Sequence, residues 1–183
     1  MTVSAADLDY VREHVREVPD FPKQGILFID VTTALQDARA WQISLDFMAE
    51  NLPEDTPDYI VGMEARGFIY GAALAAKLGI GFVPVRKPGK LPAATISESY
   101  ELEYGSDVIE MHKDALKPGD KVLLVDDLLA TGGTAEAAAK LVRKAGAEVV
   151  GASFFVELPP LKGRAKLEAQ GVKCISMLEY DVL

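Results

Sequence analysis

The sequence contains little cysteine, no long hydrophobic run and no excess of basic residues. Cys174 is the only cysteine among 183 residues, so a disulfide within the chain is excluded, and its apolar neighbours Val172 and Ile175 predict a packed strand residue rather than a nucleophile. No stretch approaches the roughly 18 continuous apolar residues of a membrane span, and the first residues lack the basic start and apolar run of a signal peptide. We therefore expect a soluble, cytoplasmic protein.

The charge balance is acidic, with 28 Asp and Glu against 19 Lys and Arg and a formal net charge of −9. Nucleic acids are bound by net basic surfaces, so no nucleic-acid partner is expected. Small anions remain candidate ligands where basic residues gather, and Arg86, Lys87 and Lys90 form such a cluster.

Several well-known catalytic patterns are also missing. The sequence has no GxxxxGK[ST] loop for nucleoside triphosphates, no GxGxxG after a strand and no serine between glycines at a strand-to-helix elbow. His14 lies on the charged face of a predicted helix and His112 at a strand end, and no His, Cys and Asp residues have metal-ligand spacing. We expect neither a catalytic histidine nor a zinc or iron site.

From residue 59 onward, short apolar runs alternate with helical segments. Such alternation is typical of a parallel sheet with crossover helices, so the fold class is predicted as α/β, a mainly parallel sheet flanked by helices, in one domain over 1–183. The expected strands are 59–62, 82–85, 122–125 and 149–156, and the expected helices are 68–78 and 134–145, ended by Gly79 and Gly146 in left-handed C-caps.

Two other regions have their own patterns. Ser4 is a plausible N-cap for an amphipathic helix that continues through Val18 to Pro19, and a second helix is predicted from Asp37, burying Trp41, Leu45 and Met48. Residues 87–112 begin with glycine and proline and then alternate apolar and polar residues, which predicts a hairpin, or hood, projecting from the sheet.

The most informative segment is VLLVDDLLATGGT, in which a buried strand ends in two aspartates and a glycine-rich loop enters a helix. Two glycines let backbone N–H groups converge on an anion, threonine hydroxyls add donors, and the helix N-terminus favours negative charge. A phosphate monoester suits this arrangement. The alternative is an ordinary strand-to-helix turn with solvated aspartates.

This segment resembles the phosphoribosyl pyrophosphate (PRPP) signature of the type I phosphoribosyltransferases, a family with a parallel sheet and a flexible hood. The strings FPKQGILFIDVT, EARGFIYGA and VPVRKPGKLP, followed by EYG at 103–105, are similar to those members of the family that act on adenine. The resemblance covers nearly the whole chain.

The resemblance implies a set of PRPP contacts. Five loop residues would hold the 5′-phosphate: Ala130, Thr131, Gly132, Gly133 and Thr134. Asp126 and Asp127 would approach the ribose hydroxyls and, through water, a Mg²⁺ ion as the one cofactor. Arg66 would act on pyrophosphate in catalysis, with Glu64 as an alternative salt-bridge partner. Lys87 and Lys90 would reach pyrophosphate, often across a homodimer interface, and would otherwise be solvated charges.

The resemblance also implies a base site in an N-terminal segment of about 1–35. The backbone around Leu27, Phe28 and Ile29 would recognise adenine, with the Phe28 ring stacking on the purine. The alternative for Phe28 is a buried side chain that serves only the hydrophobic core. Ile29 stands where many relatives carry arginine, a change that backbone contacts tolerate. In the hood, Glu103 would exchange a proton with the purine and Tyr104 would cover the site. Without the resemblance, Glu98, Glu101 and Glu103 cannot be told apart.

The implied function is transfer of the 5-phosphoribosyl group from PRPP to adenine, giving AMP and pyrophosphate, in purine salvage. The expected partners are these small molecules and a second copy of the chain. One alternative is another purine acceptor, such as guanine, hypoxanthine or xanthine. A second is a non-catalytic PRPP sensor, which would be expected to carry a DNA-binding module and a basic surface.

Overall fold

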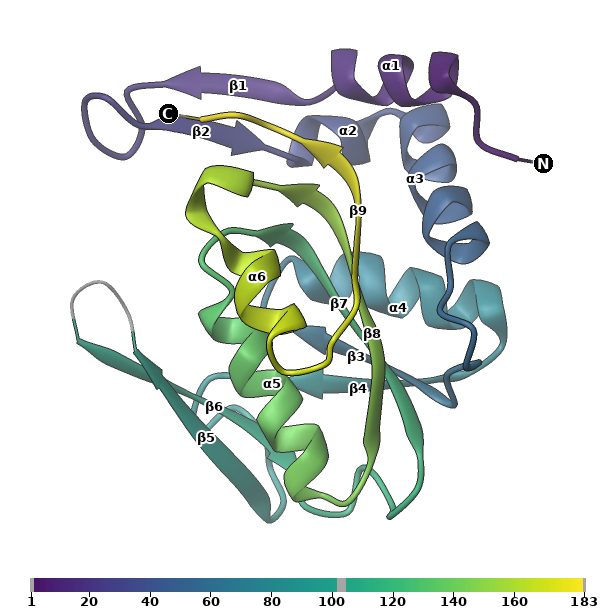
Figure 1. Cartoon of the computed structure of the whole chain (residues 1–183), viewed down its shortest axis with the longest axis vertical. Helices are drawn as coiled ribbons and strands as arrows, with labels where there is room; N and C mark the ends of the chain where they lie inside the picture. Colours follow the sequence, from purple (N-terminus) through teal and green to yellow (C-terminus); the bar gives the residue numbers. More distant parts are fainter. Residues whose placement is uncertain (1, 102–104, 183) are drawn as a thin grey trace.

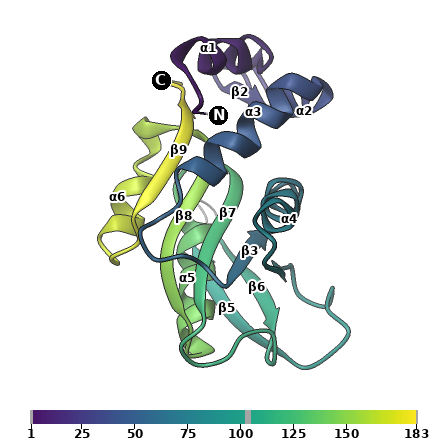
Figure 2. The ribbon, with the colours of Figure 1, turned by 90° about the vertical axis from the view of Figure 1, so that its right-hand side faces the viewer.

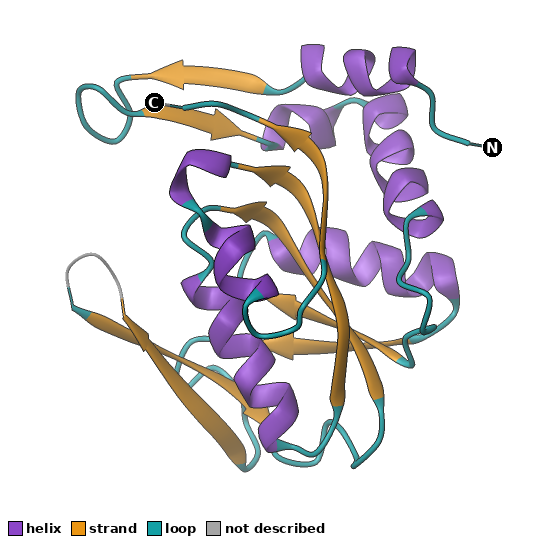
Figure 3. Cartoon of the chain, in the orientation of Figure 1, coloured by secondary structure: helices purple, strands orange, loops and turns teal. Residues whose placement is uncertain are grey.

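A five-stranded parallel sheet forms the centre of the protein, in a computed structural model that describes residues 2–101 and 105–182. The strands run in the order β4-β3-β7-β8-β9 (Figures 1 and 3). Their bounds are β3 Tyr59–Met63, β4 Gly81–Val85, β7 Lys121–Leu129, β8 Glu148–Glu157 and β9 Cys174–Glu179. The predicted parallel sheet is confirmed.

Helices cover both faces of the sheet (Figure 2). Neighbouring strand residues point to opposite faces, so Ile60 and Leu123 pack toward α3 and α4, whereas Val61 and Leu124 pack toward α5 and α6. A parallel sheet buried on both faces requires such continuous apolar strands. The helices are α3 Ala38–Glu50, α4 Gly67–Leu78, α5 Gly133–Lys144 and α6 Gly163–Glu168, preceded by the 3-10 turn η1 Pro159–Leu161.

The N-terminal elements lie over one end of the sheet, beside the last strand (Figure 1). They are α1 Ala5–Glu13, β1 Arg16–Pro19, β2 Leu27–Asp30 and α2 Thr32–Gln36. Ser4 caps α1 in a capping box with Asp7. The helix predicted to reach Val18 is wrong beyond Glu13, because Arg16–Pro19 pairs antiparallel with β2 and places Val18 opposite Phe28. A cross-strand apolar pair there outweighs the helical spacing of the valines.

The second predicted helix is confirmed as α3. Asp37 is its N-cap, and its carboxylate accepts the N–H of Ala40 at 2.8 Å. Met48 is fully buried, while the half-buried Trp41 packs edge-on against the ring of Tyr70 with centroids 5.0 Å apart. Gly79 ends α4 in the predicted left-handed conformation, with φ of 70°.

The hairpin predicted within 87–112 is confirmed as β5 Thr95–Glu101 and β6 Ser106–His112, an antiparallel pair separate from the main sheet (Figure 1). The hairpin follows β4 in the chain, and an isolated antiparallel β-bridge pairs Arg86, directly after β4, with Glu110 of β6. Lys144 of α5 holds it from the other side, donating to the Ser97 carbonyl at 3.0 Å. Across the described residues, none of the helices has the length and apolarity needed to traverse a bilayer.

Candidate functional site

The predicted site residues meet where β3 and β7 end. Arg66 follows β3, and Asp126 and Asp127 lie near the end of the adjacent strand β7. The loop Ala130–Gly132 then leads into α5. Ligands of open α/β sheets bind beyond the carboxyl ends of the strands, and this is the edge at which the residues gather.

Arg66 and Asp127 form an ion pair across this edge. The guanidinium Nε donates to the Asp127 carboxylate, whose side chain is 6% exposed, while that of Arg66 is 47% exposed. Glu64, the alternative partner suggested by the sequence, pairs instead with Arg86 at 3.1 Å and accepts the N–H of Lys87 at 2.9 Å. These two donors, the Lys87 N–H first, hold the pKa of Glu64 below its ordinary value.

Asp126 is packed against the start of α4. A Cβ added to Gly67 would lie 2.6 Å from the Asp126 Oδ1, so only glycine lets the helix approach the carboxylate this closely. That oxygen accepts the N–H of Asp127 at 2.9 Å. Burial, followed by the neighbouring Asp127 charge, raises the pKa of Asp126 well above its ordinary value.

Two adjacent carboxylates fit a hydrated magnesium ion. Within residues 2–101 and 105–182, no group of three His, Cys, Asp or Glu side chains is arranged to hold a metal directly. Mg²⁺ commonly keeps several waters and takes one or two carboxylates plus substrate phosphates. The carboxylate oxygens of Asp126 and Asp127 match that chemistry.

The loop before α5 can accept an anion. Gly132 is the N-cap of α5 and has a left-handed φ of 78°, and a glycine N-cap has no side chain to bond the first N–H groups of the helix. Gly133 is buried and Thr134 half-buried, whereas Thr131 is exposed. The free N–H groups and the helix dipole therefore favour negative charge at the end of β7.

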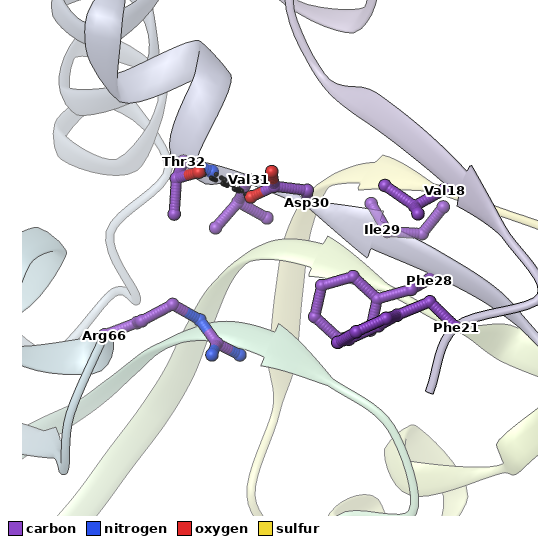
Figure 4. A pocket seen from close by; sticks show the side chains of 8 residues that line it. All are labelled: Val18, Phe21, Phe28, Ile29, Asp30, Val31, Thr32 and Arg66. Carbon is purple, nitrogen blue, oxygen red and sulfur yellow. Dashed lines mark hydrogen bonds between the residues drawn. The ribbon is translucent and has the colours of Figure 1, made fainter. Parts of the chain in front are cut away.

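A cavity of about 340 Å³ lies beside Arg66 (Figure 4). Phe28 forms one wall, its ring edge-to-face with Phe21 at 5.1 Å, and Arg66 lies on the other side. Its lining is Val18, Phe21, Phe28, Ile29, Asp30, Val31, Thr32 and Arg66. Of the three residues predicted to bind the base, Phe28 and Ile29 line the cavity, while Leu27 lies on the same strand outside the lining.

The hairpin holds one of the predicted lysines. The ammonium of Lys87 contacts the carboxylate of Asp107 and lies 3.5 Å from the Tyr100 hydroxyl. Tyr100 also touches the start of α5, because a Cβ added to Gly133 would lie 3.3 Å from its ring. Lys90 is exposed.

Glu103 and Tyr104 lie outside the described residues. Sequence reasoning missed Tyr100 and Asp107, which belong to the alternating stretch but carry no motif of their own. It also missed the role of Glu64, although the spacing E-A-R placed a carboxylate next to the arginine. Only the pairing of the strands brings these side chains to the site.

Comparison with known proteins gives a consistent match. The Phosphoribosyl transferase domain family matches residues 31–179. The adenine phosphoribosyltransferase of Yersinia pseudotuberculosis serotype I (strain IP32953) is 54% identical over 185 residues, covering 99% of each chain. The crystal structure of adenine phosphoribosyltransferase from Thermoanaerobacter pseudethanolicus ATCC 33223 is 52% identical, with a TM-score of 0.90 over 94% of this chain and 99% of that one. The Saccharomyces cerevisiae adenine phosphoribosyltransferase, complexed with an imino-altritol bisphosphate and adenine, is 41% identical, with a TM-score of 0.89 over 96% and 100%.

Proposed function

The chain belongs to the phosphoribosyl transferase family, and we infer that it transfers the 5-phosphoribosyl group of PRPP to adenine, forming AMP and pyrophosphate. The observation that carries this function is the 54% identity to an adenine phosphoribosyltransferase over essentially the full length of both chains. The chain is an enzyme of purine salvage. The anion-accepting loop, the carboxylates and the aromatic cavity supply the three kinds of contact that the reaction needs.

In this function, the loop Ala130–Thr134 binds the 5′-phosphate. Its glycine N-cap and the start of α5 support this role, since both offer N–H donors to an anion. Asp126 and Asp127 accept hydrogen bonds from the ribose hydroxyls and would hold a hydrated Mg²⁺ ion. The ion, when bound, neutralises charge on the pyrophosphate.

Arg66 and Lys87 bind the departing pyrophosphate, with Lys90 as a third cation. The bond from the anomeric carbon to the pyrophosphate oxygen breaks as the bond to the purine N9 forms, so negative charge grows on pyrophosphate, and fixed cations stabilise it. Both residues pair with carboxylates, Arg66 with Asp127 and Lys87 with Asp107. Pyrophosphate competes with these carboxylates for the cations.

The cavity beside Phe28 receives adenine. Its aromatic wall supports stacking on the purine, and the strand backbone at Leu27 and Ile29 reads the base edge. The N9 proton is lost during the reaction, and Glu103 of the hood accepts it while Tyr104 covers the site. These roles divide the single domain into a base-binding segment at about 1–35 and a hood at about 87–112.

The enzyme acts as a homodimer through α4. This helix is apolar nearly all round, and its outward face carries Ile69, which is 43% exposed, with the exposed Ala72 and Ala76 at helical spacing. A helix without a polar face requires cover on its outer side. A second copy fits, because the same helix begins beside Arg66 and would bring the two sites to one interface. A cytoplasmic location stays a prediction from the sequence.

The function is tested by incubating the pure protein with Mg²⁺, PRPP and one of adenine, guanine, hypoxanthine or xanthine, and separating the nucleotides by chromatography. AMP from adenine with stoichiometric pyrophosphate is expected. Turnover of a different base would keep the reaction but assign another purine as the acceptor. PRPP binding without turnover of any base would favour the non-catalytic PRPP sensor. Glu103→Gln, compared with Glu98→Gln, tests the hood carboxylate.

A further inference from the structure

Two glycine backbones touch behind the loop Ala130–Gly132. A Cβ added to Gly163, the first residue of α6, would lie 2.3 Å from the carbonyl oxygen of Ala130 and 3.0 Å from the N atom of Gly132. In the other direction, a Cβ on Gly132 would lie 2.9 Å from the Gly163 carbonyl oxygen. Real Cβ atoms essentially never approach within 3.0 Å, so the contact exists only because neither residue has a side chain.

The helix α6 is fastened to the sheet directly after Gly163. Arg164 pairs through two nitrogens with Glu157 at the end of β8, one of them Nε at 3.0 Å, and donates from Nη1 to the Cys174 carbonyl at 2.7 Å. Glu157 is 3% exposed and also accepts from the Ser176 hydroxyl at 2.7 Å. A two-nitrogen arginine–carboxylate pair at a buried position fixes geometry as well as charge.

Glu157 is also tied to the strand that carries the loop. It lies opposite Leu129, the residue before the loop, and Leu158 donates its N–H to the Leu129 carbonyl at 2.9 Å. On the other side, Glu136 in the first turn of α5 accepts from Gln170 at 2.6 Å and lies 3.7 Å from Lys166 of α6. The segment around α6 therefore contacts the loop, the strand before it and the helix after it.

We propose that Gly163, held in place by the Arg164–Glu157 pair, is a positioning residue that sets the backbone of Ala130–Gly132 for binding the phosphate of the sugar substrate. The inference rests on the proposed function, because that function assigns the phosphate to this loop. Gly163 acts through the loop and does not itself touch the substrate. Because α6 is fastened by Arg164, an added methyl group at Gly163 must displace the loop rather than the helix.

The test is Gly163→Ala, with steady-state kinetics and binding of ribose 5-phosphate measured by calorimetry. A shift of several tenths of an ångström misaligns the loop donors, so we expect the KM for PRPP and the Kd for ribose 5-phosphate to rise about tenfold or more. The KM for adenine stays within about twofold, because the cavity at Phe28 is built by other elements. The matched control is Gly151→Ala in β8, where a new Cβ meets ordinary contacts, the nearest at 3.4 Å from the Lys173 carbonyl oxygen.

A second variant separates positioning from general damage. Arg164→Lys keeps the charge but loses the two-nitrogen pair, so we expect a smaller rise in the KM for PRPP. The double variant combines Gly163→Ala with Arg164→Lys. Because α6 is then less firmly held, it can move away from the added methyl group, so Gly163→Ala should raise the KM for PRPP less than it does in the wild-type background. The proposal would be overturned if the two substitutions raised the KM for PRPP independently, so that their factors multiplied in the double variant. It would also be overturned if Gly163→Ala raised the KM for PRPP and the KM for adenine equally.

The remaining outcomes are also decisive. If Gly163→Ala folds and binds ribose 5-phosphate as the wild type does, the positioning role is wrong. If that variant does not fold, Arg164→Lys alone decides, and an unchanged KM for PRPP overturns the role. Failure of the wild type itself to bind ribose 5-phosphate would instead overturn the proposed function of the loop.

Discussion

Arg66 donates a hydrogen bond from its Nε to the buried carboxylate of Asp127, across the ends of two neighbouring parallel strands. The pair joins a residue proposed to bind pyrophosphate to one proposed to bind the ribose. Each group satisfies the other, so the buried Asp127 carboxylate and the Arg66 guanidinium are both paired. In the proposed function, PRPP would replace this pair with contacts of its own.

Arg66→Ala tests the catalytic side of the pair. We expect kcat/KM to fall by a factor on the order of 10² to 10³, because a cation that faces growing negative charge is lost. The variant also leaves Asp127 buried without its arginine, at a cost of about 1 to 3 kcal/mol in the free energy of unfolding.

Arg39→Ala is the matched control, since Arg39 of α3 forms an exposed ion pair with Asp7 of α1 at 3.3 Å. It should leave kcat/KM unchanged and alter the free energy of unfolding by less than about 1 kcal/mol. An Arg66→Ala enzyme with normal pyrophosphate release would contradict the assignment.

Phe28→Ala tests the base cavity. Loss of stacking on a purine costs about 1 to 2 kcal/mol, so the KM for adenine should rise about tenfold while the KM for PRPP stays the same. The control is Ile26→Ala, an exposed apolar residue at the turn between β1 and β2. Equal changes in both KM values would mean that Phe28 serves the core alone.

Ile69→Glu tests the homodimer. A carboxylate on the outward face of α4 would be buried without a partner at the interface, so we expect a shift from dimer to monomer in sedimentation velocity. Ile26→Glu changes an equally exposed isoleucine on the N-terminal hairpin and should leave the dimer intact. A wild-type monomer at micromolar concentration would show that the dimer proposal is wrong.

Glu64→Gln should lower stability in a pH-dependent way. The folded protein holds the pKa of Glu64 below the ordinary 4.5, so its contribution is present above that pH and is lost as the pH falls through the folded pKa. We expect the variant to unfold about 1 kcal/mol more easily at pH 7, by urea denaturation, with a difference that shrinks below pH 4.5. Glu54→Gln, at an exposed position, is the control and should leave the free energy of unfolding at pH 7 nearly unchanged.

Cys174 should resist alkylation in the folded protein. Burial raises the pKa of its thiol to about 11 from an ordinary 9.0, so little thiolate exists at pH 8. Iodoacetamide followed by mass spectrometry should show a slow native reaction that accelerates toward pH 11, and a fast reaction in urea. The raised pKa also means that stability from this group is lost as the pH rises from 9 to 11. Rapid native alkylation at pH 8 would contradict the buried placement.

Much of the architecture was readable from the sequence because the signals are local. The apolar runs of β3 and β7 need cover on both faces, and Asp37 and Gly79 carry helix-end chemistry within a few residues of their helices. The misread element is Arg16–Pro19. Val18 fits a helix by its spacing from the earlier valines, but pairing with the strand Leu27–Asp30 decided the outcome, and no local pattern encodes such a partner.

The sequence by itself determined the α/β fold, the loop that can accept a phosphate, and the carboxylates and arginine that accompany it, since these depend on neighbours in the chain. Tertiary structure alone decided that Arg66 pairs with Asp127 rather than Glu64, that Lys87 meets Asp107, and that Gly163 lies against Ala130. Each of these contacts joins residues brought together only by strand order and helix packing. Their energies depend on distance and burial, which a linear pattern does not contain.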